Sequence, residues 1–390
     1  MIPRTIFSAE HELFRATVKR FIAEEVMPHH AEWEKAGQTP RSLWLKAGEL
    51  GLLCCNIPTE YGGMGGDFLH TAVLIEEFSA AGATGPTFYL HSDIVAPYLL
   101  EFGTEAQKQH WLPKMASGEV IGALGMSEPS GGSDVQAMRT NARREGDEYV
   151  INGQKVFITN GHTADLLVLA CKTDPTARGR GVSLMLVETH RAGFNRGRKL
   201  EKIGCKAQDT AELFFADLRV PASNVLGGEG NGFAMLMTQL AQERLIQAIR
   251  GVACAESAVR WTIDYASQRE MFGQTLADFQ NTRFELADMH AQILAQRVFV
   301  DRCIELHVKG ELDATDAAAA KLVATNLQCA VLDRCLQLFG GWGYMWEYPI
   351  ARAFVDARMS RIGGGATEVM KQIIANSLLP KAPRATKNPR

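Results

Sequence analysis

The hydrophobic spacing of this chain changes twice along its length, and this limits the possible folds more than any other feature. Apolar residues recur at helical intervals over residues 8–118, form short strand-like runs over 120–226, and return to helical intervals from Asn231 onward. The pattern predicts a mostly helical α+β fold with three parts. These are a helical domain (residues 1–119), a β domain (120–228) and a second helical domain (229–390).

The same spacing predicts individual helices in the first and third parts. One predicted helix near the start carries a single apolar stripe, formed by Leu13, Val18, Phe21, Ile22 and Val26. The other predicted helices cover residues 71–79, 94–102, 233–268, 279–309, 313–339 and 367–377. Pro58 and the glycine pairs at residues 62–63 and 65–66 predict a loop between two of them.

Short strands are predicted for the middle part. They cover residues 148–151, 154–159, 165–171, 182–187 and 211–218. The dipeptide Asn152-Gly153 is the strongest short hairpin signal, so a tight turn is predicted between the first two strands. At the other end of the chain, residues 381–390 hold two prolines and four basic side chains and are expected to fray.

Composition excludes several classes of protein. Hydrophobic residues make up 46% of the 390 residues and charged residues 22%, which allows a large core and excludes a disordered chain. The net charge of -3 supplies no broad positive surface, so no nucleic-acid partner is predicted. No run of apolar residues is long enough for a membrane helix, and no signal peptide is visible at the N-terminus. We therefore expect a cytoplasmic protein.

The eight cysteines and ten histidines form no metal-binding pattern. No Cys-x-x-Cys or His-x-x-x-His sequence occurs, so no metal site is predicted. Scattered single thiols, and the adjacent pair Cys54-Cys55, are typical of buried and unreactive cysteines. His91 and the pair His29-His30 are interpreted as structural.

Two glycine-rich segments have the composition of ligand-binding loops. The first, residues 125–134, follows a predicted strand, and its small residues with Ser127 and Ser133 could bring amides and hydroxyls to a heteroaromatic ring or a phosphate. The second, residues 361–368, places three glycines before a helix, whose free amides could bind a carbonyl or phosphate oxygen. On composition alone, a plain turn is favoured for the first segment, and a flexible hinge explains the second equally well.

Two further features stand on predicted helices. Residues 337–344 end a helix with a glycine pair followed by aromatic residues, and composition favours a helix C-cap with a hydrophobic plug. Glu243 shares a helix face with Leu236 and Leu240. A carboxylate on an apolar face loses hydration, which raises its pKa and suits it to take a proton from carbon. By spacing alone, a helix-edge glutamate paired with Arg244 or Lys202 is the favoured alternative.

Together, the segments 125–137 and 337–356 resemble the two sequence patterns of the acyl-CoA dehydrogenase family, flavoenzymes that form the α,β double bond of acyl-CoA thioesters. The resemblance runs from Arg4 to about Leu379, and residues 24–37 and 340–351 are similar to the long-chain branch. It implies a helical bundle, a β-barrel or sandwich, and a four-helix bundle in that order. It also implies FAD as cofactor, an acyl-CoA substrate of fatty acid β-oxidation, an electron-transferring flavoprotein as partner, and a homo-oligomer built from dimers, usually a homotetramer.

The resemblance also implies roles for individual residues. The positions that line the FAD of their own subunit are Met126, Ser127, Gly132, Ser133, Phe157, Ile158 and Thr159, with Ser133 also near the substrate. The positions that bind the FAD of a neighbouring subunit are Arg269, Phe272, Gln280, Gln337, Gly340 and Gly341. Ala366 and Glu368 match the adenosine end of the cofactor, where Ala366 replaces the usual threonine. Substrate-binding positions are Ser133, Arg244, Gly364 and Gly365.

The catalytic base is predicted from a departure from the family pattern. Many members carry the base in an Ile-Tyr-Glu-Gly-Thr segment, which here reads Ile-Gly-Gly-Gly-Ala over residues 362–366. Gly364 stands at the glutamate position and cannot remove a proton. The long-chain and isovaleryl branches place the base on a helix in a Glu-Arg-Leu motif, which matches residues 243–245 here. The resemblance therefore implies that Glu243 is the base and that the Gly364 amide stabilises the enolate oxygen.

Two departures bear on the substrate. Gly363 and Gly364 replace a tyrosine and a glutamate, which predicts free volume that a branched acyl chain could fill. Asp93 stands where the long-chain branch has a small residue, and a carboxylate at the end of an apolar tunnel is costly to desolvate. Asp93 therefore predicts a shorter pocket or one that accepts an acyl chain with a polar tail. Two alternative functions remain: a flavin oxidase of the same fold that uses O₂ on acyl-CoA or nitroalkanes, and a non-catalytic partner-binding homologue.

Overall fold

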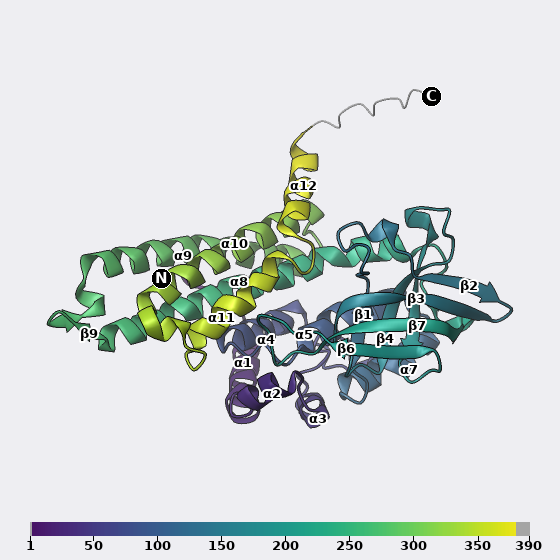
Figure 1. Cartoon of the computed structure of the whole chain (residues 1–390), viewed down its shortest axis with the longest axis horizontal. Coiled ribbons are helices and arrows are strands. Elements are labelled where there is room, and N and C mark those ends of the chain that lie inside the picture. The colour runs from purple at the N-terminus through teal and green to yellow at the C-terminus, as the bar shows by residue number, and fades with distance from the viewer. Residues whose placement is uncertain (1, 380–390) are drawn as a thin grey trace.

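The computed structural model describes residues 2–379 and has the predicted order of helices, strands and helices (Figure 1). The N-terminal part comprises α1 (Ala9–Phe21), α2 (His30–Ala36), α3 (Arg41–Glu49), α4 (Phe68–Ala80), α5 (Phe88–Leu90), α6 (Ala96–Phe102) and α7 (Glu105–Ala116). Two π-helical turns, Ile22–Val26 and His91–Val95, follow α1 and precede α6. The helices predicted at residues 71–79 and 94–102 are confirmed, whereas the prediction for 381–390 lies outside the described residues.

The apolar stripe on the first helix is shifted by one residue from the prediction. Val18, Phe21, Ile22 and Val26 are buried, but Leu13 is 73% exposed. Phe14 is buried in its place. Successive helical residues point about 100° apart, so Phe14 lies on the face of Val18 and Leu13 does not. The inclusion of Leu13 in the stripe is therefore wrong.

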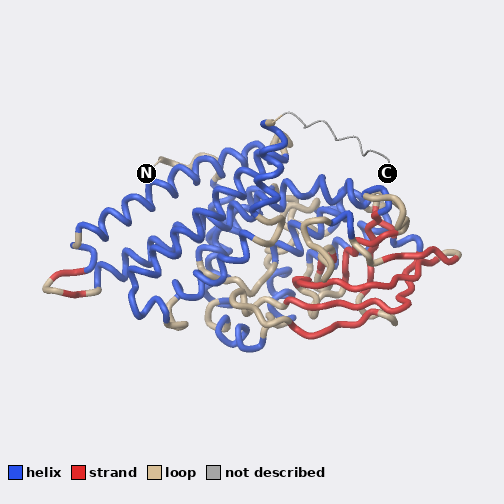
Figure 2. The backbone as a smooth tube through the Cα atoms, turned by 45° about the horizontal axis from the view of Figure 1, so that its top comes forward, coloured by secondary structure: helices blue, strands red, loops and turns tan. Residues whose placement is uncertain are grey.

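The middle part is one eight-stranded sheet, and Figure 2 shows its strands gathered at one end of the molecule. The strands are β1 (Gly122–Gly125), β2 (Asn141–Glu145), β3 (Glu148–Thr159), β4 (Leu166–Lys172), β5 (Val182–Glu188), β6 (Phe194–Lys199), β7 (Thr210–Pro221) and β8 (Val225–Leu226). Their order is β6-β7-β3-β2-β4-β5-β8, and β1 pairs in parallel with β4. β2 and β6 were not predicted, because both are polar and largely exposed and so lack the apolar alternation of a half-buried strand.

The tight hairpin predicted at Asn152-Gly153 is wrong. Residues 148–159 form one continuous strand, and the hairpin turn lies at residues 146–147, between β2 and β3. At Asn152 the pairing of β3 with β7 shifts register, and the Asn152 side chain bonds both the amide and the carboxylate of Asp217. Position 153 is a glycine because a Cβ there would lie 2.6 Å from Thr140. The dipeptide therefore encodes a β-bulge in a long strand.

The C-terminal part is built on three long helices that lie side by side in Figure 1. They are α8 (Gly232–Gln268), α9 (Gln280–Val308) and α10 (Ala314–Phe339), followed by α11 (Pro349–Ala357) and α12 (Thr367–Leu378). A small hairpin of β9 (Glu270–Met271) and β10 (Gln274–Thr275) lies at the tip of the bundle farthest from the sheet. The four predicted helices are confirmed, whereas α11, a nine-residue helix that begins at Pro349, was not predicted.

One hydrophobic cluster joins the three parts and fixes their positions. It contains Leu99 of α6, Leu184 of β5 and Ile249 of α8, all fully buried. Because α6 and the first half of α8 pack in this cluster, side chains on their facing sides are held away from water. Over residues 2–379, no helix combines the length and apolar character needed to cross a bilayer.

A buried ion network ties the N-terminal segment to the bundle. Glu76 on α4 accepts hydrogen bonds from Arg4 at 2.7 Å, from Arg15 at 3.1 Å and from Arg297 on α9 at 2.8 Å. Glu76 and Arg297 are both buried. Although burial opposes ionisation, Arg297 and Arg4 hold the pKa of Glu76 below its usual value. The carboxylate is therefore charged and compensated.

Replacing Glu76 with glutamine is expected to destabilise the fold by about 1.5–3 kcal/mol, because it removes the buried charge shared by three arginines and leaves Arg297 with its hydrogen bonds to Glu256. Urea unfolding followed by circular dichroism measures this loss. Glu305→Gln is the matched control, since Glu305 pairs with Arg302 on the surface at 2.9 Å and exposed pairs contribute about 0–1 kcal/mol. Equal stability of the two variants would contradict the assignment.

Candidate active site

Glu243 lies on the buried face of α8. The residue is 7% exposed, and its carboxylate accepts a hydrogen bond from the hydroxyl of Tyr98 on α6 at 3.2 Å. Burial raises the pKa of Glu243 to about 7, although Tyr98, Arg244 and Lys321 favour the charged form. The alternative pairing with Lys202 is wrong, because that ammonium donates to the carbonyl oxygen of Gln208. Glu243 is therefore a partly ionised carboxyl group held away from water at neutral pH.

The glycine-rich segment before α12 forms a turn against α8 and α10. Gly364 and Gly365 have φ values of +63° and +95°, where residues with a side chain are strained. A Cβ placed on Gly364 would lie 3.7 Å from the Gln247 side chain and 3.9 Å from the ammonium of Lys321. Gln247 follows Glu243 by one helical turn, so both project from the same side of α8. The turn and the carboxyl group are therefore neighbours.

The free volume predicted at the glycine turn is present at only one of the two positions. At Gly364 the nearest neighbours lie at ordinary van der Waals distance. At Gly363 a Cβ would lie 2.7 Å from the sulfur of Met359, which fills that place. The prediction of free space at Gly363 is wrong, and the prediction at Gly364 remains.

Two further polar groups are buried beside Glu243. The Nε of Arg244 is buried and has no hydrogen-bond partner among residues 2–379. Asp93 accepts a hydrogen bond from the Thr71 hydroxyl at 2.6 Å, and burial raises its pKa to about 7. Gln242 donates to the main-chain carbonyl oxygen of Asp93 at 2.6 Å. Asp93 therefore lies against the segment of α8 that carries the candidate base.

The loop after β1 is anchored from its centre. Glu128 is buried and accepts hydrogen bonds from the amides of Arg139 and Thr140 and from the ammonium of Lys155, the last at 2.8 Å. Lys155 also donates to the carbonyl oxygen of Met126 at 3.0 Å. With the loop held in this way, Ser127 is half-buried, and both Gly132 and Ser133 are exposed.

The end of β3 lies beside this loop, since the amide of Val156 donates to the carbonyl oxygen of Ser127 at 3.0 Å. Phe157 has a φ of +61° and is 68% exposed. It lies within a second shift in the register of β3 with β7, between Lys155 and Ile158. Thr159 accepts a hydrogen bond from Gln208, whose own amide oxygen is buried without a partner among the described residues. An uncovered aromatic ring beside an unpaired buried oxygen fits a planar, hydrogen-bonding ligand such as a flavin.

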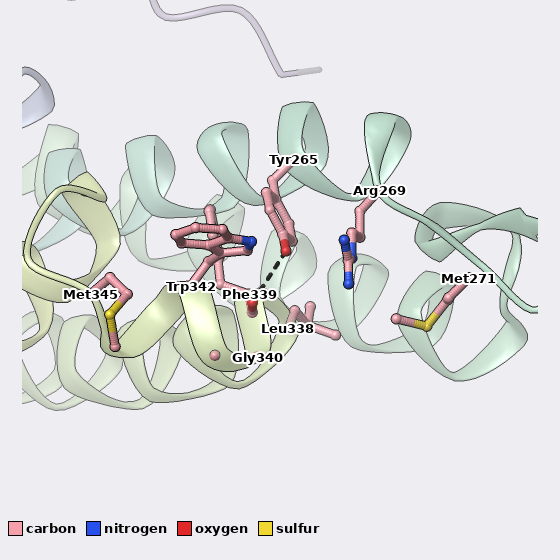
Figure 3. A pocket seen from close by; sticks show the side chains of 9 residues that line it. Tyr265, Arg269, Met271, Leu338, Phe339, Gly340, Trp342 and Met345 are labelled. Atoms are coloured by element: carbon pink, nitrogen blue, oxygen red, sulfur yellow. Dashed lines mark hydrogen bonds between the residues drawn. The ribbon is translucent and has the colours of Figure 1, made fainter.

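Three further predicted cofactor residues, Arg269, Gly340 and Gly341, line a cavity of about 400 Å³ beside the end of α8 (Figure 3). Its lining residues are Tyr265, Arg269, Met271, Leu338, Phe339, Gly340, Gly341, Trp342 and Met345. The Arg269 side chain makes no hydrogen bond or ion pair within residues 2–379, and Phe272 nearby in sequence is 93% exposed. Gln280 and Gln337 are also exposed. A free guanidinium beside aromatic rings and glycine backbone fits an anionic nucleotide.

One chain does not bring the predicted cofactor residues into one place. Glu243 and Arg269 stand 26 positions apart on the straight helix α8, which corresponds to about 39 Å at 1.5 Å per residue. β1, which precedes the loop with Ser127, lies in the sheet, whereas β9, which follows α8 and Arg269, lies at the opposite end of the molecule (Figure 1). Ala366 and Glu368 begin α12, where Ala366 offers no side-chain cap. Within one chain, the loop after β1 and the cavity at the end of α8 are therefore separate places.

Tyr98 and Lys321 belong to the site but had no sequence signal. Tyr98 precedes Glu243 by 145 residues and reaches it only because α6 packs on α8. Lys321 follows an alanine-rich stretch of α10, and a lysine is seldom buried in a folded protein. Its place directly after four alanines, residues 317–320, is not distinctive enough to predict burial.

Three potential metal ligands come together outside this site: His11, Asp67 and His70. Their contacts are explained by helix capping. The amide of Ser8 donates to His11 Nδ1 at 3.0 Å, and the amide of Asp67 donates to His70 Nδ1 at 3.2 Å. His11 Nε2 therefore carries the proton and donates to Asp67 at 3.1 Å. These bonds close the first turns of α1 and α4.

Comparison with known proteins shows the family to which the chain belongs. Family models match residues 8–119 (acyl-CoA dehydrogenase, N-terminal domain), 123–218 (middle domain) and 230–379 (C-terminal domain). The chain is 50% identical over 378 residues to the long-chain specific acyl-CoA dehydrogenase of Sus scrofa mitochondria, covering 96% of this chain and 88% of that protein.

Two solved structures have the same fold. An acyl-CoA dehydrogenase from Geobacillus kaustophilus superposes with a TM-score of 0.95 at 48% identity, covering 96% of this chain and 100% of that one. An acyl-CoA dehydrogenase from Bacillus anthracis complexed with FAD gives 0.89 at 32% identity, covering 95% and 67%. The fold and site define an FAD-dependent oxidoreductase. The chain belongs to the acyl-CoA dehydrogenase family.

Proposed function

We propose that this protein dehydrogenates a medium- or long-chain acyl-CoA thioester to the trans-2-enoyl-CoA, with Glu243 as the catalytic base. The observation that carries the proposal is the buried Glu243 carboxyl beside the open glycine turn at Gly364. Gly364 stands where many members of the family carry a glutamate base, so the turn itself offers no carboxyl group at that position.

Glu243 would remove the α proton of the thioester. A base works best when its pKa lies near the working pH, and burial raises the pKa of Glu243 to about 7. The Tyr98 hydroxyl donates to one carboxylate oxygen and holds it in a single orientation. When bound, FAD supplies the acceptor for the hydride that leaves the β carbon. Loss of the α proton and the β hydride together leaves the double bond.

The developing negative charge on the thioester oxygen needs a donor, because a carboxylate in water is too weak a base for an α proton. The amide of Gly364 donates to no other group within residues 2–379, and the residue is accessible. A preorganised backbone donor of this kind is typically worth about 10²–10³-fold in rate. Arg244, with its unpaired buried Nε, is a second group available to the substrate.

The cofactor residues form two surfaces, which supports a homo-oligomer. Residues Ser127, Ser133, Phe157 and Thr159 would hold the flavin ring in their own subunit, whereas Arg269, Gln280, Gln337 and Gly341 would hold the FAD of a neighbour. We extend the proposal to a dimer-based assembly that passes its electrons to an electron-transferring flavoprotein.

Within the medium- to long-chain range, two features favour a chain of medium length with room for a branch. Gly364 leaves open space next to Gln247, one turn from the base. The buried Asp93 carboxyl lies against α8 and makes a long apolar tunnel costly there.

Anaerobic mixing of the purified holoenzyme with octanoyl-, palmitoyl- and a methyl-branched acyl-CoA tests the proposal. Loss of the yellow flavin colour with at least one thioester, fastest for octanoyl or the branched chain, is the expected result. Faster loss with palmitoyl-CoA would contradict the short pocket only. A colourless protein, or one inert to every thioester, would overturn the function, and peroxide formed during turnover would identify an oxidase.

Replacing Tyr98 with phenylalanine is expected to move the acid limb of the pH profile of kcat/KM upward. The Tyr98 hydrogen bond favours the ionised carboxylate, so its loss raises the pKa of Glu243 and leaves less base at pH 6. Hydrogen bonds to charged groups contribute enough to predict a loss of about tenfold at pH 6.

Activity above pH 8 is expected to change little in this variant. Tyr149→Phe is the matched control, because Tyr149 donates to Glu229 at 2.7 Å in the β domain. An identical pH profile for wild type and Tyr98→Phe would show that the hydrogen bond does not act on the base.

A further inference from the structure

Lys321 is a buried lysine with an unusual set of partners. It lies on α10, is 1% exposed, and donates from Nζ to the carbonyl oxygen of Gly363 at 2.6 Å and to that of Gly365. Among residues 2–379 it makes no ion pair within 4 Å. A buried ammonium is costly unless its hydrogen bonds are satisfied, so these two carbonyl groups are what hold it there.

The bond to Gly363 fixes the direction of the next amide. The chain has no cis peptide bond within its described residues, so the carbonyl group of Gly363 and the N–H of Gly364 point in opposite directions across one planar unit. With the oxygen turned toward Lys321, the N–H of Gly364 is turned away from α10. That amide donates to no other group among residues 2–379.

Three consecutive glycines would not hold this arrangement alone. Glycine populates positive and negative φ with similar ease, so the peptide between Gly363 and Gly364 could rotate and reverse its N–H at little cost. Lys321 opposes that rotation because it binds the carbonyl groups on both sides of Gly364. A reversed peptide would break the bond to Gly363 and leave the buried charge with one partner.

We propose that Lys321 is a positioning residue, whose ammonium fixes the Gly363–Gly364 peptide so that the Gly364 N–H faces the thioester oxygen of the substrate. The proposal rests on the proposed function. It deepens that function by naming the side chain that orients the Gly364 amide. That side chain stands on α10, whereas the base stands on α8.

Charges around Lys321 support the same role. Two ionisable groups on α8 affect the pKa of Lys321: Arg244 lowers it and Glu243 raises it. Burial lowers the pKa of Lys321 to about 8, so the ammonium form is present at neutral pH. The same positive charge favours the ionised form of Glu243. One side chain therefore orders the donor and stabilises the charged base.

Exchange of α protons measures this role without any redox step. The probe is a CoA thioester with two methyl groups on carbon 3, which has α protons but no β hydrogen. Incubated with the holoenzyme in D₂O, it gives one proton to Glu243 and takes back a deuteron, and mass spectrometry follows the uptake. Calorimetry gives the Kd of the same thioester.

The test compares wild type, Glu243→Gln, Lys321→Met and the control Lys172→Met. Lys172 is also a buried lysine that donates to loop carbonyl groups, those of Ala177 at 3.1 Å and Arg178, but in the β domain. We expect Lys321→Met to exchange about 10²-fold more slowly with an unchanged Kd. Lys172→Met is expected to exchange at the wild-type rate.

The outcomes separate the two proposals. No exchange by wild type would overturn the proposed function itself. Exchange by wild type that is lost in Glu243→Gln but retained in Lys321→Met would overturn the role of Lys321 and leave the function standing. A slower rate explained by a weaker Kd would also overturn positioning. If Lys321→Met does not fold, Lys321→Gln keeps one donor, and its exchange must fall below that of wild type at equal Kd.

Discussion

Replacing Glu243 with glutamine is expected to lower kcat by about 10²–10⁴-fold, the range typical of removing a general base. Glutamine has nearly the same shape, so the contact with Tyr98 and the packing of α8 are retained. It has no site for a proton taken from carbon. Binding of the thioester is expected to persist, because the change removes chemistry and leaves the pocket in place.

The pH dependence of the wild-type enzyme follows from the same carboxyl group. Burial raises the pKa of Glu243 to about 7, and only the ionised form accepts the α proton. The kcat/KM value is therefore expected to rise with pH through about 7, where half of the base is ionised, and to level off above about pH 8. Stopped-flow flavin reduction measures both the variant and the profile.

Glu101→Gln is the matched control for this experiment. Glu101 stands on α6 near Tyr98 and accepts a hydrogen bond from Gln239, which precedes Glu243 by one turn of α8. Its carboxylate is exposed, so its loss is expected to leave kcat within about twofold, as surface changes usually do. If Glu243→Gln retained a tenth or more of the wild-type rate, the base would have to lie elsewhere.

The side of α8 that Glu243 occupies could be predicted from sequence because it follows from local geometry. Leu236 and Leu240 precede Glu243 at one-turn intervals, and a helix places such residues on one face whatever surrounds it. The long helices were predicted for the same reason. By contrast, the partners of Glu243 come from α6 and α10, and no local pattern encodes a contact across 145 residues.

Two predictions from local sequence were wrong because contacts made in the folded chain determine the structure at those positions. Asn152-Gly153 has the composition of a hairpin turn, yet the same two residues fit a bulge once β7 pairs along the whole of β3. The missing tyrosine at Gly363 suggested open space, but Met359 fills it from the preceding turn. In the first case the pairing strand β7 decides the outcome, and in the second the Met359 side chain of the preceding turn does.

The division of the cofactor residues between two ends of the molecule leads to the second large effect. If Arg269 serves the FAD of a neighbouring subunit, then Glu243→Gln and Arg269→Ala damage different sites when they stand on different chains. Each variant alone is expected to be nearly inactive, the first for lack of a base and the second for lack of bound FAD. A mixed dimer of the two has one site with both residues intact.

Mixed dimers isolated with two affinity tags test this arrangement. With the two changes on separate chains, about half of the wild-type activity is expected, since one of two symmetric sites is complete. The matched control places both changes on one chain and pairs it with wild type. Each site then lacks one residue, and these dimers are expected to be nearly inactive. If Arg269 instead served its own subunit, the two results would be exchanged, because the intact site would then require both residues on the same chain.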